Sequence, residues 1–168
     1  MTDDVIELIL ADHRLFEDLF RDLRDDTNDR AKVLAELSTR LVAHAEAEEA
    51  EVYPALRKFK KVDAEEVEHG AEEHAEGHQA LLALMEIEDT SSEDWEDHLQ
   101  KLVEAVNHHL DEEERTILND ARETVPDERR AELGTKFVEA REERIAAGCG
   151  DLDYVRELAE RTEDRIDE

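Results

Sequence analysis

Apolar residues recur every three or four positions along most of the chain, which is the period of an amphipathic α-helix. Short polar stretches interrupt this pattern, and it resumes after each of them. Together with cap and breaker residues, the pattern predicts helices over residues 3–25, 30–60, 64–87 and 93–122. Thr2 is expected to cap the first helix. Pro54 is expected to kink the second, because proline has no backbone N–H to donate.

A further helix is predicted from Pro126 to about Ala147. The Gly-Cys-Gly segment at 148–150 ends it, and a short final helix follows over residues 151–165. Neither helix carries a ligand-like pattern. We therefore expect a bundle over residues 1–124 and a C-terminal extension over 125–168. The extension should pack on the bundle or on a second subunit, so a homodimer is one expected assembly.

The loops between the first four helices are only a few residues long, which favours antiparallel packing of successive helices. The predicted fold is all-α, an up-down-up-down four-helix bundle with one or two additional C-terminal helices. Only 5 Gly and 2 Pro interrupt the 168 residues, and a chain of this size forms one domain with a substantial core. No run of alternating β-branched residues predicts a strand.

The chain carries 50 acidic and 21 basic residues, giving a formal net charge of −29. This charge argues against nucleic acid or an anionic membrane as a partner, since nothing would neutralise phosphate. The first ten residues are acidic and lack the basic and apolar regions of a signal peptide. The longest apolar run, at residues 80–85, is too short to cross a bilayer. A cytoplasmic location is expected, and the single Cys149 cannot form an internal disulfide.

Seven polar residues interrupt the apolar faces of the four predicted helices. The first helix carries a histidine, the second and fourth each carry a histidine and a glutamate four residues apart, and the third carries two histidines four apart. These residues are His13, His44, Glu48, His74, His78, His109 and Glu113. Residues four apart lie one turn above each other on a helix. At a rise of about 1.5 Å per residue, the four mid-helix positions meet at one level of a bundle.

A single core histidine is more often packed through hydrogen bonds than bound to a metal. Five imidazoles and two carboxylates at one level would cost several kcal/mol for each unpaired charge, and bound cations would offset that cost. Seven ligands suit two metal ions bridged by Glu48 and Glu113. His13 and His44 would hold one ion, and the three other histidines the second. Imidazole and carboxylate ligands are typical of iron, manganese or zinc.

The order His, HxxxE, HxxxH, HxxxE, with EE and YP following the second-helix histidine, resembles the hemerythrin-like HHE cation-binding family. The resemblance covers about residues 3–122. It implies a four-helix bundle around two iron ions in a non-haem di-iron centre, oxo- or hydroxo-bridged, with the seven residues above as ligands. Hemerythrins proper end with HxxxxD, whereas this chain has HxxxE at His109 and Glu113. This departure weakens the implication of simple oxygen carriage.

The iron held by two histidines would have fewer protein ligands and keep an open position for a small ligand. One hypothesis is a protein that binds oxygen, peroxide or nitric oxide for storage, sensing or scavenging. The alternative is a di-iron catalase-like or peroxidase-like enzyme, for which no catalytic residue can be named. A third interpretation makes the metal purely structural. A ferritin-like oxidase would need two inward Glu-x-x-His motifs, and only Glu66 with His69 has that spacing.

The remaining histidines, His69, His98 and His108, lie off the apolar lines or at their edge and are predicted to be surface residues. Tyr53, directly after the second-helix motif, is expected to be a packed tyrosine, with an approach to the metal cavity as the alternative.

Overall fold

The computed structural model describes residues 3–166, with side chains described to residue 162. Throughout this part of the chain, regular structure is helical and no strand is present. The elements in chain order are α1 (Val5–Arg24), α2 (Arg30–Ala47), η1 (Glu48–Val52), α3 (Tyr53–Leu56), α4 (Ala64–Met85), α5 (Glu93–Arg115), α6 (Ile117–Thr124), α7 (Asp127–Ala146) and α8 (Leu152–Ile166).

Polar side chains begin the four helices that carry the predicted ligands. Asp4, Asp29, Asp63 and Ser92 each accept a hydrogen bond from a backbone N–H in the first turn of the helix that follows. These bonds satisfy N–H groups that have no partner within the helix. The predicted cap Thr2 lies outside the described residues, and Asp4 is the cap of α1.

The prediction of one helix over residues 30–60 is wrong. The α-helix α2 ends at Ala47, and the chain continues through the wider π-turn η1 into the short helix α3. Pro54 explains this change, because its ring would collide with the carbonyl four residues earlier. The N–H of Tyr53 therefore bonds to the carbonyl of Glu48, five residues back. The distortion falls on the predicted ligand Glu48 itself, and π-turns are frequent at functional sites.

The predicted helix over residues 93–122 is also interrupted. Thr116 has φ −107° and ψ −81° and separates α5 from α6. Its hydroxyl donates to the carbonyl of Glu112 at 2.7 Å, a bond that competes with the helical pattern and bends helices. The bend comes three residues after the predicted ligand Glu113, so the ligand-bearing part of α5 stays regular.

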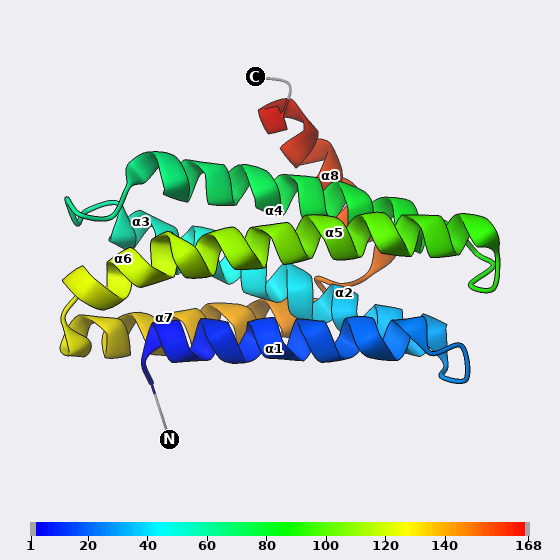
Figure 1. Ribbon diagram of the computed structural model, residues 1–168, viewed down its shortest axis with the longest axis horizontal. Helices are drawn as coiled ribbons and strands as arrows, with labels where there is room; N and C mark the ends of the chain where they lie inside the picture. Colours follow the sequence, from blue (N-terminus) through cyan, green and yellow to red (C-terminus); the bar gives the residue numbers. More distant parts are fainter. Residues whose placement is uncertain (1–2, 167–168) are drawn as a thin grey trace.

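The long helices lie side by side in pairs (Figure 1). Helix α1 packs against α2, and α4 packs against α5. Helix α7 lies along α1 and α2, whereas α8 packs against α4 and projects away from the other helices. The C-terminal helices α7 and α8 thus pack against the helices that precede them. Among the described residues, no helix combines the length and the apolar character needed to span a membrane.

The apolar core is divided into two clusters. One includes Phe16, Leu37 and Trp95, and the other includes Ile9 and Phe137. Along each ligand-bearing helix, the predicted ligands lie at or next to the point where residues of one cluster give way to residues of the other. The fold therefore places a buried polar layer between two apolar halves.

Candidate metal centre

All seven predicted ligands are buried, and six of them meet in two groups that share one glutamate. Within each group, one ligand atom from each residue lies within 4.8 Å of the others. The groups are His13, His44 and Glu113, and Glu48, His74, His109 and Glu113. Both groups combine imidazole nitrogen with carboxylate oxygen, the donor set expected for iron, manganese or zinc.

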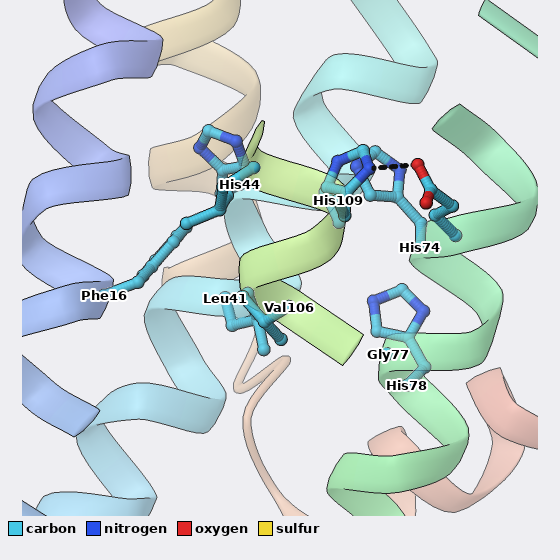
Figure 2. Close-up of a pocket in the computed structure, with 11 residues that line it drawn as sticks. Phe16, Leu41, His44, His74, Gly77, His78, Val106 and His109 are labelled. Carbon is cyan, nitrogen blue, oxygen red and sulfur yellow. Dashed lines mark hydrogen bonds and ion pairs between the residues drawn. The ribbon is translucent and has the colours of Figure 1, made fainter. Parts of the chain in front are cut away.

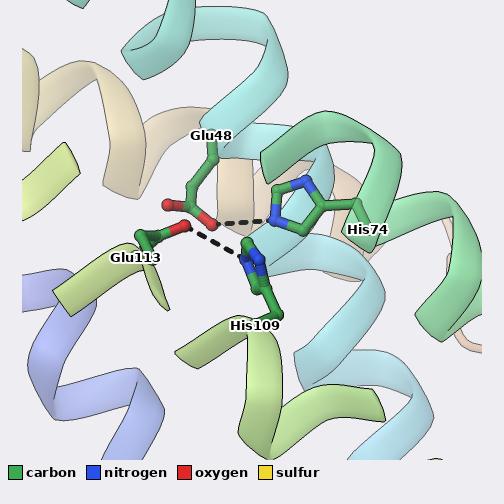
Figure 3. A group of neighbouring side chains, drawn as sticks. All are labelled: Glu48, His74, His109 and Glu113. Carbon is green, nitrogen blue, oxygen red and sulfur yellow. Dashed lines mark ion pairs between the residues drawn. The ribbon is translucent and has the colours of Figure 1, made fainter. Parts of the chain in front are cut away.

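Glu48 lies between imidazoles that belong to different groups. Its Oε1 is 2.8 Å from Nε2 of His44 and 3.2 Å from Nε2 of His74. Figure 3 shows the Glu48 carboxylate directed toward the centre, where it faces Glu113 and His109. This position, between histidines from α2 and α4, is the one that a carboxylate bridging two cations requires.

Glu113 occupies the corresponding position from α5. Its Oε1 is 3.5 Å from Nε2 of His13, and its Oε2 is 3.1 Å from Nε2 of His109. The hydroxyl of the buried Tyr53 donates to Oε2 of Glu113 at 2.5 Å. Tyr53 is therefore both packed and in contact with a predicted ligand, which unites the two expectations for it. Its ring stacks on His74 at 5.5 Å.

The atoms that face the centre include imidazole–carboxylate ion pairs at 2.8–3.5 Å, but they make no hydrogen bond of favourable geometry to any described residue. In the described part of the chain these include Nε2 of His13, His44, His74 and His109, both carboxylate oxygens of Glu48 and Oε1 of Glu113. Buried polar atoms in native proteins are almost always hydrogen-bonded, and leaving one unsatisfied costs about 1–3 kcal/mol. So many orphaned donor atoms directed at one point fit bound cations, which would satisfy all of them together.

The opposite ring nitrogen of each of these histidines does have a partner, and that partner is a carboxylate from another helix. The Nδ1 contacts are His13 with Glu114 at 3.2 Å, His44 with Asp12 at 2.8 Å, His74 with Glu49 at 3.2 Å, and His109 with Glu73 at 3.2 Å. A carboxylate accepting from Nδ1–H fixes the tautomer that leaves Nε2 free for metal, orients the ring and raises its basicity.

These four contacts form a closed ring around the bundle. Each ligand-bearing segment supplies a carboxylate to a histidine of another segment. Helix α1 supplies α2, η1 at the end of α2 supplies α4, α4 supplies α5, and α5 supplies α1. Each of these acidic residues also lies directly beside a predicted ligand in the sequence. The EE pair that contains Glu49 was visible in the sequence, but the role of Glu49, and those of Asp12, Glu73 and Glu114, were not.

Two arginines support this ring. Nη2 of Arg14 donates to Oε2 of Glu114 at 2.6 Å. Nη1 of Arg141, on α7, donates to both carboxylate oxygens of Asp12 at 2.8 and 2.9 Å. The C-terminal extension, in which no ligand-like pattern was found, thus holds the carboxylate that orients His44. The ring of Phe137, also on α7, meets His44 edge-on at 5.4 Å.

Replacing Arg141 by alanine should weaken metal binding by about 10- to 100-fold, as for other changes to groups that orient metal ligands. Without the guanidinium, Asp12 can turn away and His44 loses its fixed tautomer. Metal affinity measured by competition with a chelator checks this. Arg129→Ala, which removes a pair with Glu132 on the surface of the same helix, should leave the affinity at the wild-type value. Equal affinities in the two variants would contradict the role given to Arg141.

His78 is buried but belongs to neither group. It lies one turn from His74 on α4 (Figure 2), and neither of its ring nitrogens has a hydrogen-bond partner within the described part of the chain. Its ring lines a cavity of about 20 Å³ together with His44, His74 and His109. The other lining residues are mostly apolar side chains, Phe16, Leu41, Val106 and Leu110 among them.

In the metal-free protein, burial and neighbouring charges shift the pKa values of the layer in opposite directions. Burial lowers the pKa of His44, but the carboxylates of Glu48 and Asp12 outweigh burial and raise it to about 10. Against the same penalty, Glu113 and Glu73 raise the pKa of His109 to about 10. Without metal, these imidazoles therefore keep a proton at neutral pH.

The other members of the layer complete this balance. Burial raises the pKa of Glu113, but His109 and His13 outweigh it and hold that pKa well below the usual range. Burial, followed by repulsion from His74, lowers the pKa of His78 to about 3. His78 is therefore neutral, and among the described residues neither its one N–H nor the lone pair of its other ring nitrogen has a hydrogen-bond partner, unlike Nδ1 of the four histidines of the ring.

The comparisons with known proteins agree with this geometry. A family model described as the hemerythrin HHE cation binding domain matches residues 4–121. The chain belongs to this hemerythrin family. The matched region ends in α6 and contains all of the segments that supply the two groups. The buried histidine and glutamate cluster fits the cation-binding character of the family.

One curated relative by sequence is a "DNA nickase" of Nostoc sp., 28% identical over 142 residues. The match covers 82% of this chain but only 39% of the nickase. The chain thus spans about two fifths of the length of that relative. No solved structure gives a significant match.

Proposed function

We propose that this protein is a non-haem di-iron protein that binds a small ligand, namely oxygen, peroxide or nitric oxide, in storage, sensing or scavenging. The observation that supports this best is the set of orphaned inward-facing donor atoms in two groups that share Glu113. Two iron ions, when bound, would supply open coordination positions and electrons to such a ligand.

The proposed ligands are divided as the two groups suggest. His13 and His44 hold one ion, and His74 and His109 hold the other. Glu113, common to both groups, and Glu48, between His44 and His74, bridge them. His78 remains the proposed third histidine of the second ion, because its nitrogens are buried without partners beside His74. The carboxylate ring holds the other four imidazoles, whereas His78 has no such anchor among the described residues and is free to reorient on metal binding.

The proposed architecture is an up-down-up-down bundle over residues 1–124 with an extension over 125–168. Chain direction supports it, since α1, α2, α4 and α5 alternate in direction in Figure 1 and the loops between them are short. The extension is more than a cover in this proposal, because α7 supplies Arg141 to the carboxylate ring.

The cavity beside the imidazoles supports a small and weakly polar ligand. Its volume of about 20 Å³ accommodates one water-sized molecule. Apolar walls exclude bulk water and would let a diatomic molecule or peroxide approach the metal ions. Gly77 forms part of this wall, and a Cβ added there would meet no atom within 4 Å.

The iron-loaded protein should therefore show a visible charge-transfer absorption that changes on addition of oxygen, peroxide or nitric oxide. In Gly77→Ala the added methyl group enters the cavity, so we expect the same iron content but at least tenfold slower ligand binding. The variant should also be more stable by about 0.5–1 kcal/mol, since alanine replaces glycine within a helix. Stopped-flow absorption and thermal unfolding measure the two effects.

Glu76→Ala, on the exposed face of the same helix, is the matched control and should bind the ligand at the wild-type rate. Iron-loaded protein with no spectral response to any of the three ligands would overturn the proposal. Unchanged binding rates in Gly77→Ala would show that the ligand does not bind in this cavity.

The alternative is a catalase-like or peroxidase-like enzyme that decomposes hydrogen peroxide. The hydroxyl of Tyr53, 2.5 Å from Glu113, favours this alternative to the extent that it places a proton beside the centre. It predicts oxygen evolution or peroxide consumption at a rate proportional to bound iron, with loss of turnover in Tyr53→Phe. A fully loaded protein that binds peroxide without turnover would exclude the enzyme and retain the binding protein.

We do not extend the nickase activity of the Nostoc relative to this chain. Most of that protein lies outside the match, and a net charge of −29 opposes binding to a phosphate backbone. The absence of a nucleic-acid partner, the cytoplasmic location and the homodimer remain predictions.

A further inference from the structure

A second cluster of metal-ligating side chains lies on the outer side of α4 and α5. His69 and His108, predicted as surface residues, are 49% and 63% exposed. Between them lies the carboxylate of Glu73, which is 5% exposed. Nε2 of His108 is 3.0 Å from Oε2 of Glu73, and Nε2 of His69 is 3.7 Å from the same oxygen.

The three residues satisfy the geometric requirements of a cation site. His69 and Glu73 are four residues apart on α4, one turn above each other, and His108 approaches from α5. One ligand atom from each residue lies within 4.8 Å of the others. Two imidazoles and one carboxylate suit divalent first-row transition metals, with water completing the coordination. The carboxylate of Glu72 lies beside the other ring nitrogen of His69, with its Oε2 3.6 Å from Nδ1.

Glu73 connects this cluster to the buried layer. Its two carboxylate oxygens face in different directions, since Oε1 accepts from Nδ1 of His109 at 3.2 Å while Oε2 faces His69 and His108. One carboxylate thus belongs both to the ring that orients the buried imidazoles and to the surface cluster. Charge placed at Oε2 must change how strongly Oε1 holds the imidazole of His109.

We propose that His69, Glu73 and His108 form an outer binding site for a divalent first-row transition-metal ion, coupled to the inner centre through Glu73. A cation at Oε2 draws electron density from the carboxylate and weakens its bond with His109, so occupancy of the outer site alters the inner ion held by that histidine. The binding of the outer ion is independent of the proposed function, whereas the coupling rests on it. The excess of acidic residues favours the approach of any cation.

Zinc titration of the iron-loaded protein by calorimetry tests the site, with iron content measured before and after. We expect one zinc equivalent that is weakened at least tenfold in both His69→Ala and His108→Ala. His98→Ala, which removes an exposed-edge histidine of α5 paired with Asp94, should bind zinc like the wild type. The proposed site would be overturned if the wild type took up no such zinc equivalent, or if both cluster variants bound zinc as tightly as the wild type. The three residues would then form surface ion pairs only.

The coupling has its own measurement. Zinc is spectroscopically silent, so a shift of the iron absorption on filling the outer site, at unchanged iron content, reports on the inner centre, and the shift should disappear in His108→Ala. Zinc binding without any shift would overturn the coupling. A chain that holds no iron but retains the His69- and His108-dependent zinc equivalent would overturn the proposed function and support the outer site.

Discussion

Glutamine in place of Glu113 is expected to reduce the metal content from two ions per chain to one or none. Glu113 is the residue common to both groups, and its two oxygens face His13 and His109. An amide has one oxygen and no charge, so it cannot bridge two cations as the carboxylate can. Metal analysis after desalting, together with the visible spectrum of the iron-loaded protein, measures the loss.

The same variant should be less stable without metal by about 3–5 kcal/mol, the usual effect of removing one partner of a buried ion pair. Protonated His109 and His13 would then lie buried without their main carboxylate. Glu112→Gln is the matched control, because Glu112 precedes Glu113 on α5 but pairs with Arg115 outside the layer. It should retain both ions and nearly all of the stability. Two tightly bound ions in Glu113→Gln would contradict the bridging role.

Removing the metal is expected to reverse the way in which stability depends on pH. In the metal-free protein, His44 and His109 have pKa values of about 10, raised from the ordinary value of 6.5. Their stabilising contribution is complete below pH 6.5 and is lost as the pH rises toward 10. The free energy of unfolding should fall across that window by at most about 1.4 kcal/mol per pH unit for each histidine.

The carboxylates set how the stability of the metal-free protein changes at low pH. Because the pKa of Glu113 is lowered in the fold, its contribution is present above its ordinary value of 4.5 and is lost as the pH falls below it. The metal-free protein should therefore be most stable between about pH 4.5 and 6.5. The metal-loaded protein should instead gain stability from pH 6 to 8, because metal replaces the proton on each Nε2 and protons compete with it.

Urea unfolding at several pH values, in chelator and in excess metal, measures both profiles. The acidic surface also repels itself more strongly at higher pH, so the series is repeated at high salt, which screens exposed charges far more than buried ones. Metal-free stability that is level or rising from pH 6.5 to 9 at high salt would contradict the charged state assigned to these histidines.

The carboxylate ring explains how a bundle of ordinary helices can keep a metal-binding layer organised. Each imidazole is fixed at Nδ1 from another helix, so the ring geometry depends on four interhelical contacts at once. His78 has no such contact in the described part of the chain and lies outside both groups. The four histidines whose Nδ1 is held by a carboxylate lie in the two groups, and His78, which lacks such a contact, does not.

The helices themselves were largely predictable, because the apolar period and the cap residues are local properties. The predicted helix bounds were wrong where a single residue disturbs the backbone hydrogen bonds of a helix. Pro54 was expected to kink the helix after the ligands, but its collision with the preceding turn places the π-turn on Glu48. Thr116 interrupts the predicted fourth helix through its hydroxyl bond to the chain, and nothing in the apolar pattern marks that bond.

The sequence by itself determined which residues of each helix would face the core, and hence that imidazoles and carboxylates would be buried at one level. It did so because spacing along a helix sets the direction of each side chain, without reference to any other helix. Only the tertiary structure decided which acid meets which histidine, that Arg141 holds Asp12, and that His69 and His108 share Glu73. Those pairings depend on the rotation and height of one helix relative to another, which the packing of the whole bundle sets.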